Sequence, residues 1–160
     1  MPDLPIDAWY CWVGLAAASL AVAGVAVELP TRPAPDAAAA ADTVDAVAAA
    51  SYPTTAEHPV DASAVRLDPH RLSLRNAGGT THATFGFGPV VPVAADSRLQ
   101  RVATGDPPSS VFDSPVAFAR AVEQARERTE SRDATWRQAP ARIRITRVHW
   151  EGTNVTLVDA

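Results

Sequence analysis

The apolar stretch from Trp9 to Leu29 constrains the fold of this 160-residue chain more than any other feature. All residues from Val13 to Val27 are apolar or small, and no charged residue occurs between Asp7 and Glu28. Because a helix rises about 1.5 Å per residue, about 20 such residues cross a hydrocarbon core of about 30 Å. The stretch therefore predicts a transmembrane helix, with the chain at the cell membrane as a single-pass protein.

Two kinds of side chain favour a membrane anchor. Aromatic rings with polar tips suit the headgroup level of a bilayer, and small residues four positions apart let two membrane helices approach closely. The predicted anchor residues are Trp9, Tyr10, Trp12, Gly14, Ala18 and Ala21. Other interpretations stay open. An alanine-rich composition gives small-residue pairs by chance, and the stretch is also compatible with a buried helix of a soluble domain or with a cleaved signal peptide.

The prolines at positions 30, 33 and 35 end the predicted helix, because proline lacks an N–H and disfavours helix before it. We expect a transmembrane anchor in residues 1–30, a Pro/Ala-rich stalk or linker in residues 31–60, and a small α+β domain in residues 61–160. Asp36 is a plausible N-cap for the alanine-rich segment that runs to Ser51. Since Val44 and Val47 are the only large apolar residues there, we expect a weakly packed helix, with a flexible linker as the alternative.

Alternating apolar and polar residues predict an antiparallel sheet in the C-terminal domain. We expect strands at Ala64–Leu67, Arg71–Arg75, Thr80–Phe87, Val90–Val93 and Leu99–Ala103. We also expect a terminal hairpin, in which Ile143, Ile145 and Val148–Trp150 lead through the turn Glu151-Gly152-Thr153-Asn154 to Val155 and Leu157. Asp68-Pro69-His70 is typical of a tight turn, whereas Tyr52–Asp61 and Gly105–Asp113 are expected to be irregular.

One helix is expected to cover this sheet. Ser114 followed by Pro115 is typical of a helix start, and Phe118, Val122 and Ala125 form an apolar stripe up to about residue 132. The predicted fold is therefore α+β: a transmembrane helix, an Ala-rich stalk, a small antiparallel sheet with one covering helix, and a C-terminal hairpin.

Composition and motif spacing argue against an enzyme. The single cysteine, Cys11, excludes a disulfide framework and a thiolate metal site. The four histidines lack the spacing of a zinc helix, and neither a nucleophile elbow nor a dinucleotide fingerprint is present. The net charge of −4 gives no nucleic-acid footprint. We expect no catalytic residue, no cofactor, no metal and no nucleic-acid partner.

Two surface features remain as candidate sites. Arg137, Arg142, Arg144 and Arg147 form a basic cluster in the sequence, which is either a solvated sheet face or a docking patch for an acidic partner or lipid headgroups. Asn154-Val155-Thr156 matches a glycosylation sequon in an expected surface turn. The sequon is usable only if the domain lies outside the cell.

Several short motifs resemble an uncharacterised haloarchaeal family of small single-pass membrane proteins. They are Asp7-Ala8-Trp9-Tyr10 with Trp12 and Gly14, Ala56-Glu57-His58-Pro59, Asp68-Pro69-His70-Arg71 and Phe85-Gly86-Phe87-Gly88-Pro89. Members of that family resemble components found beside type IV pilus-like assembly or secretion machinery. The resemblance implies an envelope role as a pilin-like or accessory subunit. The chain lacks the basic residue and glycine of a prepilin peptidase site, which favours an accessory subunit.

The sequence thus predicts a non-enzymatic, membrane-anchored envelope protein whose partners are the lipid bilayer and other envelope subunits. Its soluble domain is expected outside the cell, although the positive-inside rule applied to Arg32 favours the cytoplasm. A tethered ligand-binding domain or enzyme, and a cytoplasm-facing regulator of membrane machinery, are the alternatives.

Overall fold

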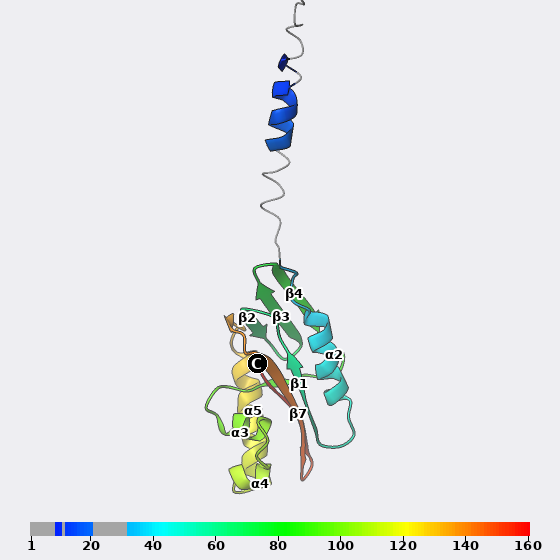
Figure 1. Cartoon of the computed structure of the whole chain (residues 1–160). Helices are drawn as coiled ribbons and strands as arrows, with labels where there is room; N and C mark the ends of the chain where they lie inside the picture. The colour runs from blue at the N-terminus through cyan, green and yellow to red at the C-terminus, as the bar shows by residue number, and fades with distance from the viewer. Residues whose placement is uncertain (1–8, 11, 21–31) are drawn as a thin grey trace, which may run out of the picture. The chain divides into compact units, whose positions relative to one another are not determined.

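The computed structural model describes residues 9–10, 12–20 and 32–160. The chain divides into two compact units, Met1–Arg32 and Pro33–Ala160. The second unit contains all the sheets and the helices labelled in Figure 1.

The prediction of a transmembrane helix is wrong for the described residues of the first unit. Residues 9–10 and 12–20 are helical, but no described helix is long and apolar enough to cross a membrane. The single-pass membrane localisation loses its support for the same reason. Residues 11 and 21–29 of the predicted span, Ala21 included, lie outside the described residues.

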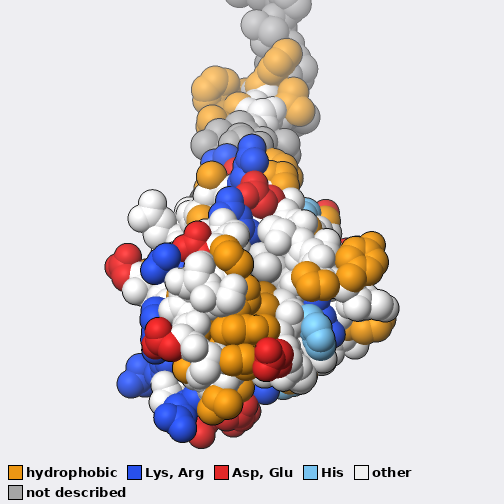
Figure 2. Space-filling model, turned by 90° about the horizontal axis from the view of Figure 1, so that it is seen from below, with side chains coloured by type: hydrophobic (Ala, Val, Ile, Leu, Met, Phe, Trp, Pro, Cys, Tyr) orange, Lys and Arg blue, Asp and Glu red, His pale blue; other side chains and the backbone are white. Residues whose placement is uncertain are grey.

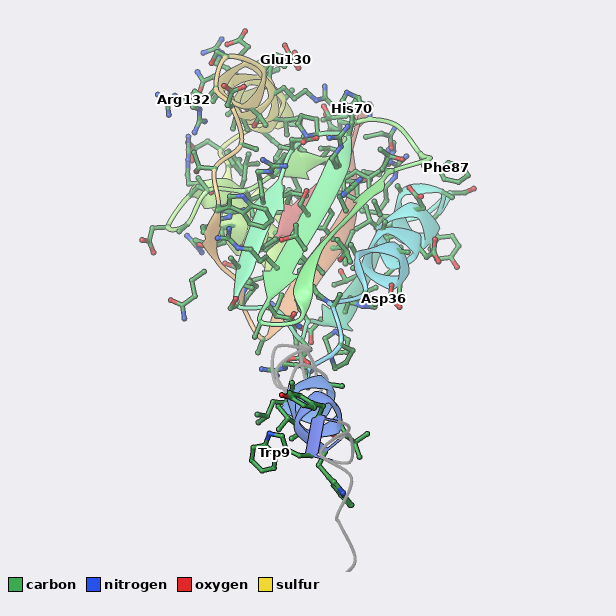
Figure 3. All side chains as sticks on the ribbon, turned by 90° about the horizontal axis from the view of Figure 1, so that it is seen from above. Trp9, Asp36, His70, Phe87, Glu130 and Arg132 are labelled. Atoms are coloured by element: carbon green, nitrogen blue, oxygen red, sulfur yellow. The ribbon has the colours of Figure 1, made fainter. Side chains whose placement is uncertain are left out.

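The predicted anchor residues that the structure describes are exposed. Trp9, Tyr10 and Trp12 have 68%, 67% and 71% of their surface accessible, and Trp9 is labelled in Figure 3. Gly14 has open space around its Cα, and Ala18 is also exposed.

The second unit contains two four-stranded sheets and four helices among the described residues. In chain order the elements are α2 (Ala37–Ala48), β1 (Thr54–Pro59), β2 (Ala64–Leu67), β3 (Arg71–Asn76), β4 (Gly79–Thr84), β5 (Val91–Pro92), α3 (Arg98–Ala103), α4 (Pro108–Val111), α5 (Pro115–Glu130), β6 (Arg137–Gln138), β7 (Arg142–Trp150) and β8 (Thr153–Asp159). Sheet A has the order β1-β7-β8-β5, and sheet B has the order β4-β3-β2-β6.

Sheet A is the central layer of the unit, and the alternation of β7 shows why. Ile143 and Ile145 point into one hydrophobic core, shared with α2 and sheet B, whereas Val148 points into a second core, shared with α3 and α5. On β8, Val158 belongs to the first core and Leu157 to the second. In Figure 1, α2 accordingly lies on one side of β7, and α3, α4 and α5 gather on the other.

The domain is α+β, but its sheet arrangement differs from the one expected. Two sheets replace the single antiparallel sheet, and β5 pairs with β8 in parallel. Three helices rather than one contribute to the cores, because α2 packs against β1, β3, β4 and β7 and α3 joins α5 in the second core. The β2–β3 hairpin and the β7–β8 hairpin form where alternation and turn residues indicated them.

Helix α2 is part of the core, so the interpretation of this segment as a stalk is wrong. Asp36 caps it as expected, because its Oδ1 accepts the Ala39 N–H at 2.9 Å. The helix buries Ala37, Ala40, Ala41, Val44, Val47 and Ala48. Small alanine side chains let the helix lie close to the edge strands β1 and β4, so a face with few large residues still packs well.

Three further segments differ from expectation, and one of them is Gly105–Asp113, which was expected to be irregular but contains helix α4. Leu99–Ala103 is helix α3 rather than a strand, since Leu99, Val102 and Ala103 form one buried helical face behind the Ser97 cap. Strand β1 occupies a segment that was expected to be irregular. Its only apolar residue facing the first core is Ala56, and Pro59 is tolerated because β1 is an edge strand.

We predict that Val44→Ala lowers the free energy of unfolding by about 2 kcal/mol, because Val44 is 1% exposed and two buried carbon atoms are removed. Denaturant titration of both proteins measures the change. Val116→Ala is the matched control, since Val116 is 68% exposed on α5 and should change stability little. Equal effects of the two substitutions would contradict a core role for α2.

Candidate functional site

The outer face of sheet B carries a concentration of cationic side chains. In β2 and β3, Val65, Leu67, Leu72 and Leu74 point into the first core, so the residues between them face outward. The outward residues of the three longer strands include Arg66, Arg71, Ser73, Arg75 and His82. We call this set, together with Trp136, the basic face.

Strand register places these residues around one position. Ser73 lies in the middle strand, directly between Arg66 of β2 and His82 of β4. Arg71 and Arg75 lie two residues before and after it, on the same side of the strand. No Asp or Glu occurs in β2, β3, β4 or β6, so the strands themselves supply no carboxylate to neutralise this charge.

Trp136 holds two of the arginines. It precedes β6, which pairs with β2 through Ala64 and Gln138. The Cζ atom of Arg75 lies 4.6 Å from the Trp136 ring centroid, and that of Arg66 lies 5.1 Å from it. Such cation–π contacts orient a guanidinium while leaving its N–H donors unused. Within the described residues, Arg66 and Arg75 form no ion pair with a carboxylate.

Ser73 is the unusual residue of the basic face. It is 1% exposed, although its side chain points to the outer side of the sheet. Its Oγ has no hydrogen-bond partner among the described residues. A buried hydroxyl without a partner costs about 1–3 kcal/mol, so the folded protein carries this hydroxyl at an energetic disadvantage.

The turn and loop at one end of sheet B are fixed by hydrogen bonds. The Phe85 N–H donates to the His70 carbonyl at 2.9 Å, and the Val90 N–H donates to the Pro69 carbonyl at 2.9 Å. His70 and Phe87 accordingly lie at the same end of the folded unit in Figure 3. The Asp68–Arg71 and Phe85–Pro89 motifs are thus neighbours in space, and the first motif ends at Arg71, which belongs to the basic face.

Helix α2 anchors the same loop through Asp45. The Asp45 carboxylate accepts the Gly86 N–H at 2.9 and 3.0 Å and the Phe87 N–H at 3.1 Å. A Cβ on Gly86 would lie 3.3 Å from Asp45 Oδ2, closer than most such contacts. Glycine at this position therefore allows the close approach on which the anchoring depends.

The structure does not bring the four arginines of the predicted docking patch to one surface. Arg137 belongs to sheet B, whereas Arg142, Arg144 and Arg147 belong to β7 of sheet A. Arg147 projects from the face of β7 opposite to Arg144, and its Nη1 donates to Thr156 Oγ1 at 3.1 Å.

Glu57 of β1 engages two of these arginines. Register places Glu57 opposite Arg144, whose Nε donates to Glu57 Oε1 at 2.9 Å and whose Nη1 donates to the Thr104 carbonyl at 3.2 Å. Arg142 Nη1 donates to Glu57 Oε2 at 3.0 Å. The guanidinium of Arg144, followed by that of Arg142, lowers the pKa of Glu57 below its ordinary value of 4.5.

Two of the histidines, His58 and His149, and the sequon at Asn154 lie outside the basic face. His82 belongs to the basic face, and His70 lies at its end. Asn154 is exposed on β8, and its Oδ1 lies 2.6 Å from Nδ1 of His149. His58 Nδ1 lies 2.9 Å from Thr43 Oγ1, which itself donates to the Ala39 carbonyl. Within the described part of the chain, no group of three His, Cys, Asp or Glu residues is arranged to hold a metal ion.

Other surfaces of the folded unit mix their charges. The outer side of α5 alternates cations and anions, and Arg126 pairs with Glu123 at 3.2 Å. Figure 2 likewise shows acidic and basic side chains intermixed on the face seen from below, beside a band of hydrophobic side chains. The basic face differs because its strands contribute cations alone.

Comparison with known proteins identifies a family. The profile of DUF7283, a family of unknown function, matches residues 3–148. The chain belongs to this family. The match includes every residue of the basic face and ends within β7. No curated protein and no solved structure matches the chain.

Sequence reasoning did not identify the basic face. The alternation of Arg71-Leu72-Ser73-Leu74-Arg75 was visible, and it would place the two arginines and the serine on one side of a strand. No local pattern predicts that Trp136 lies beside Arg75, since 60 residues separate the two in the chain.

We predict that Glu57→Gln makes stability less dependent on pH below about pH 4.5. In the wild-type protein the folded-state pKa of Glu57 is depressed, so its contribution is present above its unfolded-state value of 4.5 and is lost as pH falls through the folded-state pKa. Denaturant titrations over an acidic pH series measure this. Glu130→Gln is the charge-matched control. The prediction would be refuted if the free energy of unfolding fell equally with decreasing pH in both variants.

We predict that Ser73→Ala raises the free energy of unfolding by about 1 kcal/mol, because the change removes a buried, unpartnered hydroxyl. Ser63→Ala provides the comparison, since Ser63 Oγ donates to the Arg75 carbonyl at 3.0 Å and its removal should be neutral or destabilising. Thermal and denaturant unfolding measure both. A clear destabilisation by Ser73→Ala would show that the hydroxyl has a partner after all.

Proposed function

We propose that this protein is a non-enzymatic accessory subunit of an envelope assembly, and that its basic face docks an acidic segment of a partner subunit. The assembly meant is of the type IV pilus-like class that the motif resemblance implies. The proposal depends on docking through sheet B and requires no membrane-spanning helix in this chain.

The observation that carries the proposal is the pair of arginines on Trp136. Arg66 and Arg75 lie 5.1 and 4.6 Å from the same ring, without a carboxylate partner in the described structure. Arginine and tryptophan are enriched among the residues that dominate binding energy at protein interfaces. Their arrangement supplies oriented donors for carboxylates together with an apolar surface for packing.

Charge distribution favours a compact acidic partner. The whole chain carries a net charge of −4, so a long polyanion such as nucleic acid would be repelled beyond the basic face. An acidic segment that covers sheet B alone would be attracted by the arginines of the basic face and would not extend over the negatively charged remainder of the surface. The motifs of the resemblance support the same surface, because the Asp68–Arg71 turn and the Phe85–Pro89 loop lie at its end.

The test is affinity capture from an envelope fraction with the tagged full-length chain. The variant combines Arg66→Ala with Arg75→Ala, and the charge-matched control combines Arg120→Ala with Arg128→Ala on α5. We expect the wild-type and control proteins to recover the same envelope subunits, identified by mass spectrometry, and the Arg66/Arg75 variant to lose them. Recovery that is unchanged in this variant, or recovery of no envelope subunit by any of the proteins, would refute the proposal.

A further inference from the structure

We propose that the centre of the basic face, at Ser73, is a binding site for a phosphate monoester carried by the docking segment of the partner. This inference rests on the proposed docking function and adds the chemical group that is recognised. The observation that carries it is the juxtaposition of a buried, unpartnered hydroxyl with three arginines and a histidine.

The strand register defines the site. Arg66 and His82 flank Ser73 on the neighbouring strands, and side chains directly opposite in an antiparallel pair have Cβ atoms about 5 Å apart. Arg71 and Arg75 flank it along β3 at a separation of about 7 Å. Four positions that carry N–H donors thus surround Ser73 on one side of the sheet.

This set of donors fits a tetrahedral dianion better than a carboxylate. A phosphate monoester carries a charge of about −1.5 to −2 and three strong acceptor oxygens. Three arginines supply both the charge and the multiple N–H donors for such a group, and the hydroxyl supplies one more donor. A carboxylate has a single charge and two oxygens, so it would leave part of this set unused.

The arginines on Trp136 must move for the site to open. Ser73 Oγ has almost no accessible surface, and Arg66 and Arg75 are held near the ring of Trp136. Their long stems allow each guanidinium to turn from the ring toward a bound phosphate, because a charge-assisted hydrogen bond is stronger than an exposed cation–π contact. Binding is therefore expected to change the environment of the Trp136 indole as well as that of Ser73.

The experiment uses the full-length chain and two matched probes, N-acetyl-O-phosphoserine amide and N-acetyl-glutamate amide. Calorimetric titrations are made at constant ionic strength, and the Trp136 indole N–H is followed by NMR. We expect saturable binding of the phosphoserine probe, a shift of the indole resonance, and at least tenfold weaker binding of the glutamate probe.

Three variants locate the site. Ser73→Ala should lower the affinity for the phosphoserine probe about tenfold, as loss of one hydrogen bond to a charged group implies, although this variant is expected to fold more stably than the wild type. The Arg66→Ala/Arg75→Ala variant should abolish binding, and Ser109→Ala, on α4 away from the basic face, should leave it unchanged. Equal affinity for the two probes, or wild-type affinity in Ser73→Ala, would overturn the inference.

Phosphatase treatment of the envelope fraction separates this inference from the docking proposal. Loss of Arg66/Arg75-dependent capture after treatment supports the phosphate site. Capture that survives treatment but still requires the two arginines overturns the phosphate site and leaves docking intact. Tight binding of the phosphoserine probe without capture of any envelope subunit supports the phosphate site and overturns the docking proposal.

Discussion

The burial of sheet A on both faces is the constraint on which the rest of the folded unit depends. A strand pair covered on one side alone would leave either Ile143 and Ile145 or Val148 and Leu157 in water. Each face therefore needs its own cover. Helix α2 with sheet B supplies one, and α3 with α5 supplies the other. The alanine-rich sequence of α2 follows from this arrangement, since small side chains allow a helix to close the gap between the edge strands β1 and β4.

Only one face of sheet B packs into the first core, so the side chains of its other face are available to bind a partner. Its inner side chains are aliphatic, while its outer side combines arginines, a tryptophan and a buried serine hydroxyl that gains nothing for stability. The cluster at Glu57 is a useful contrast. There Arg142 and Arg144 of sheet A both donate to the carboxylate of Glu57 on the neighbouring strand, which explains the lowered pKa of Glu57.

Patterns among neighbouring residues correctly predicted several strands and one helix. The alternation in β2, β3, β7 and β8 and the Ser114-Pro115 start of α5 all appear where the residues indicated them. The predictions fail where an element forms because of contacts with residues far away in the chain. Strand β1 has one inward apolar residue, Ala56, and becomes a strand because β7 offers it a partner. The apolar stretch after Trp9 predicted a transmembrane helix, but no helix of the described residues is long and apolar enough to cross a membrane.

The sequence by itself determined the α+β class, the two hairpins, the cap of α2 and the apolar stripe of α5, because turn chemistry, capping and periodicity act over a few neighbouring residues. Only the tertiary structure decided that α2 belongs to the core, that two sheets form, and that Trp136 lies beside Arg66 and Arg75. These outcomes depend on contacts between residues far apart in the chain. Such contacts are set by which faces must be buried together, and no single segment encodes them.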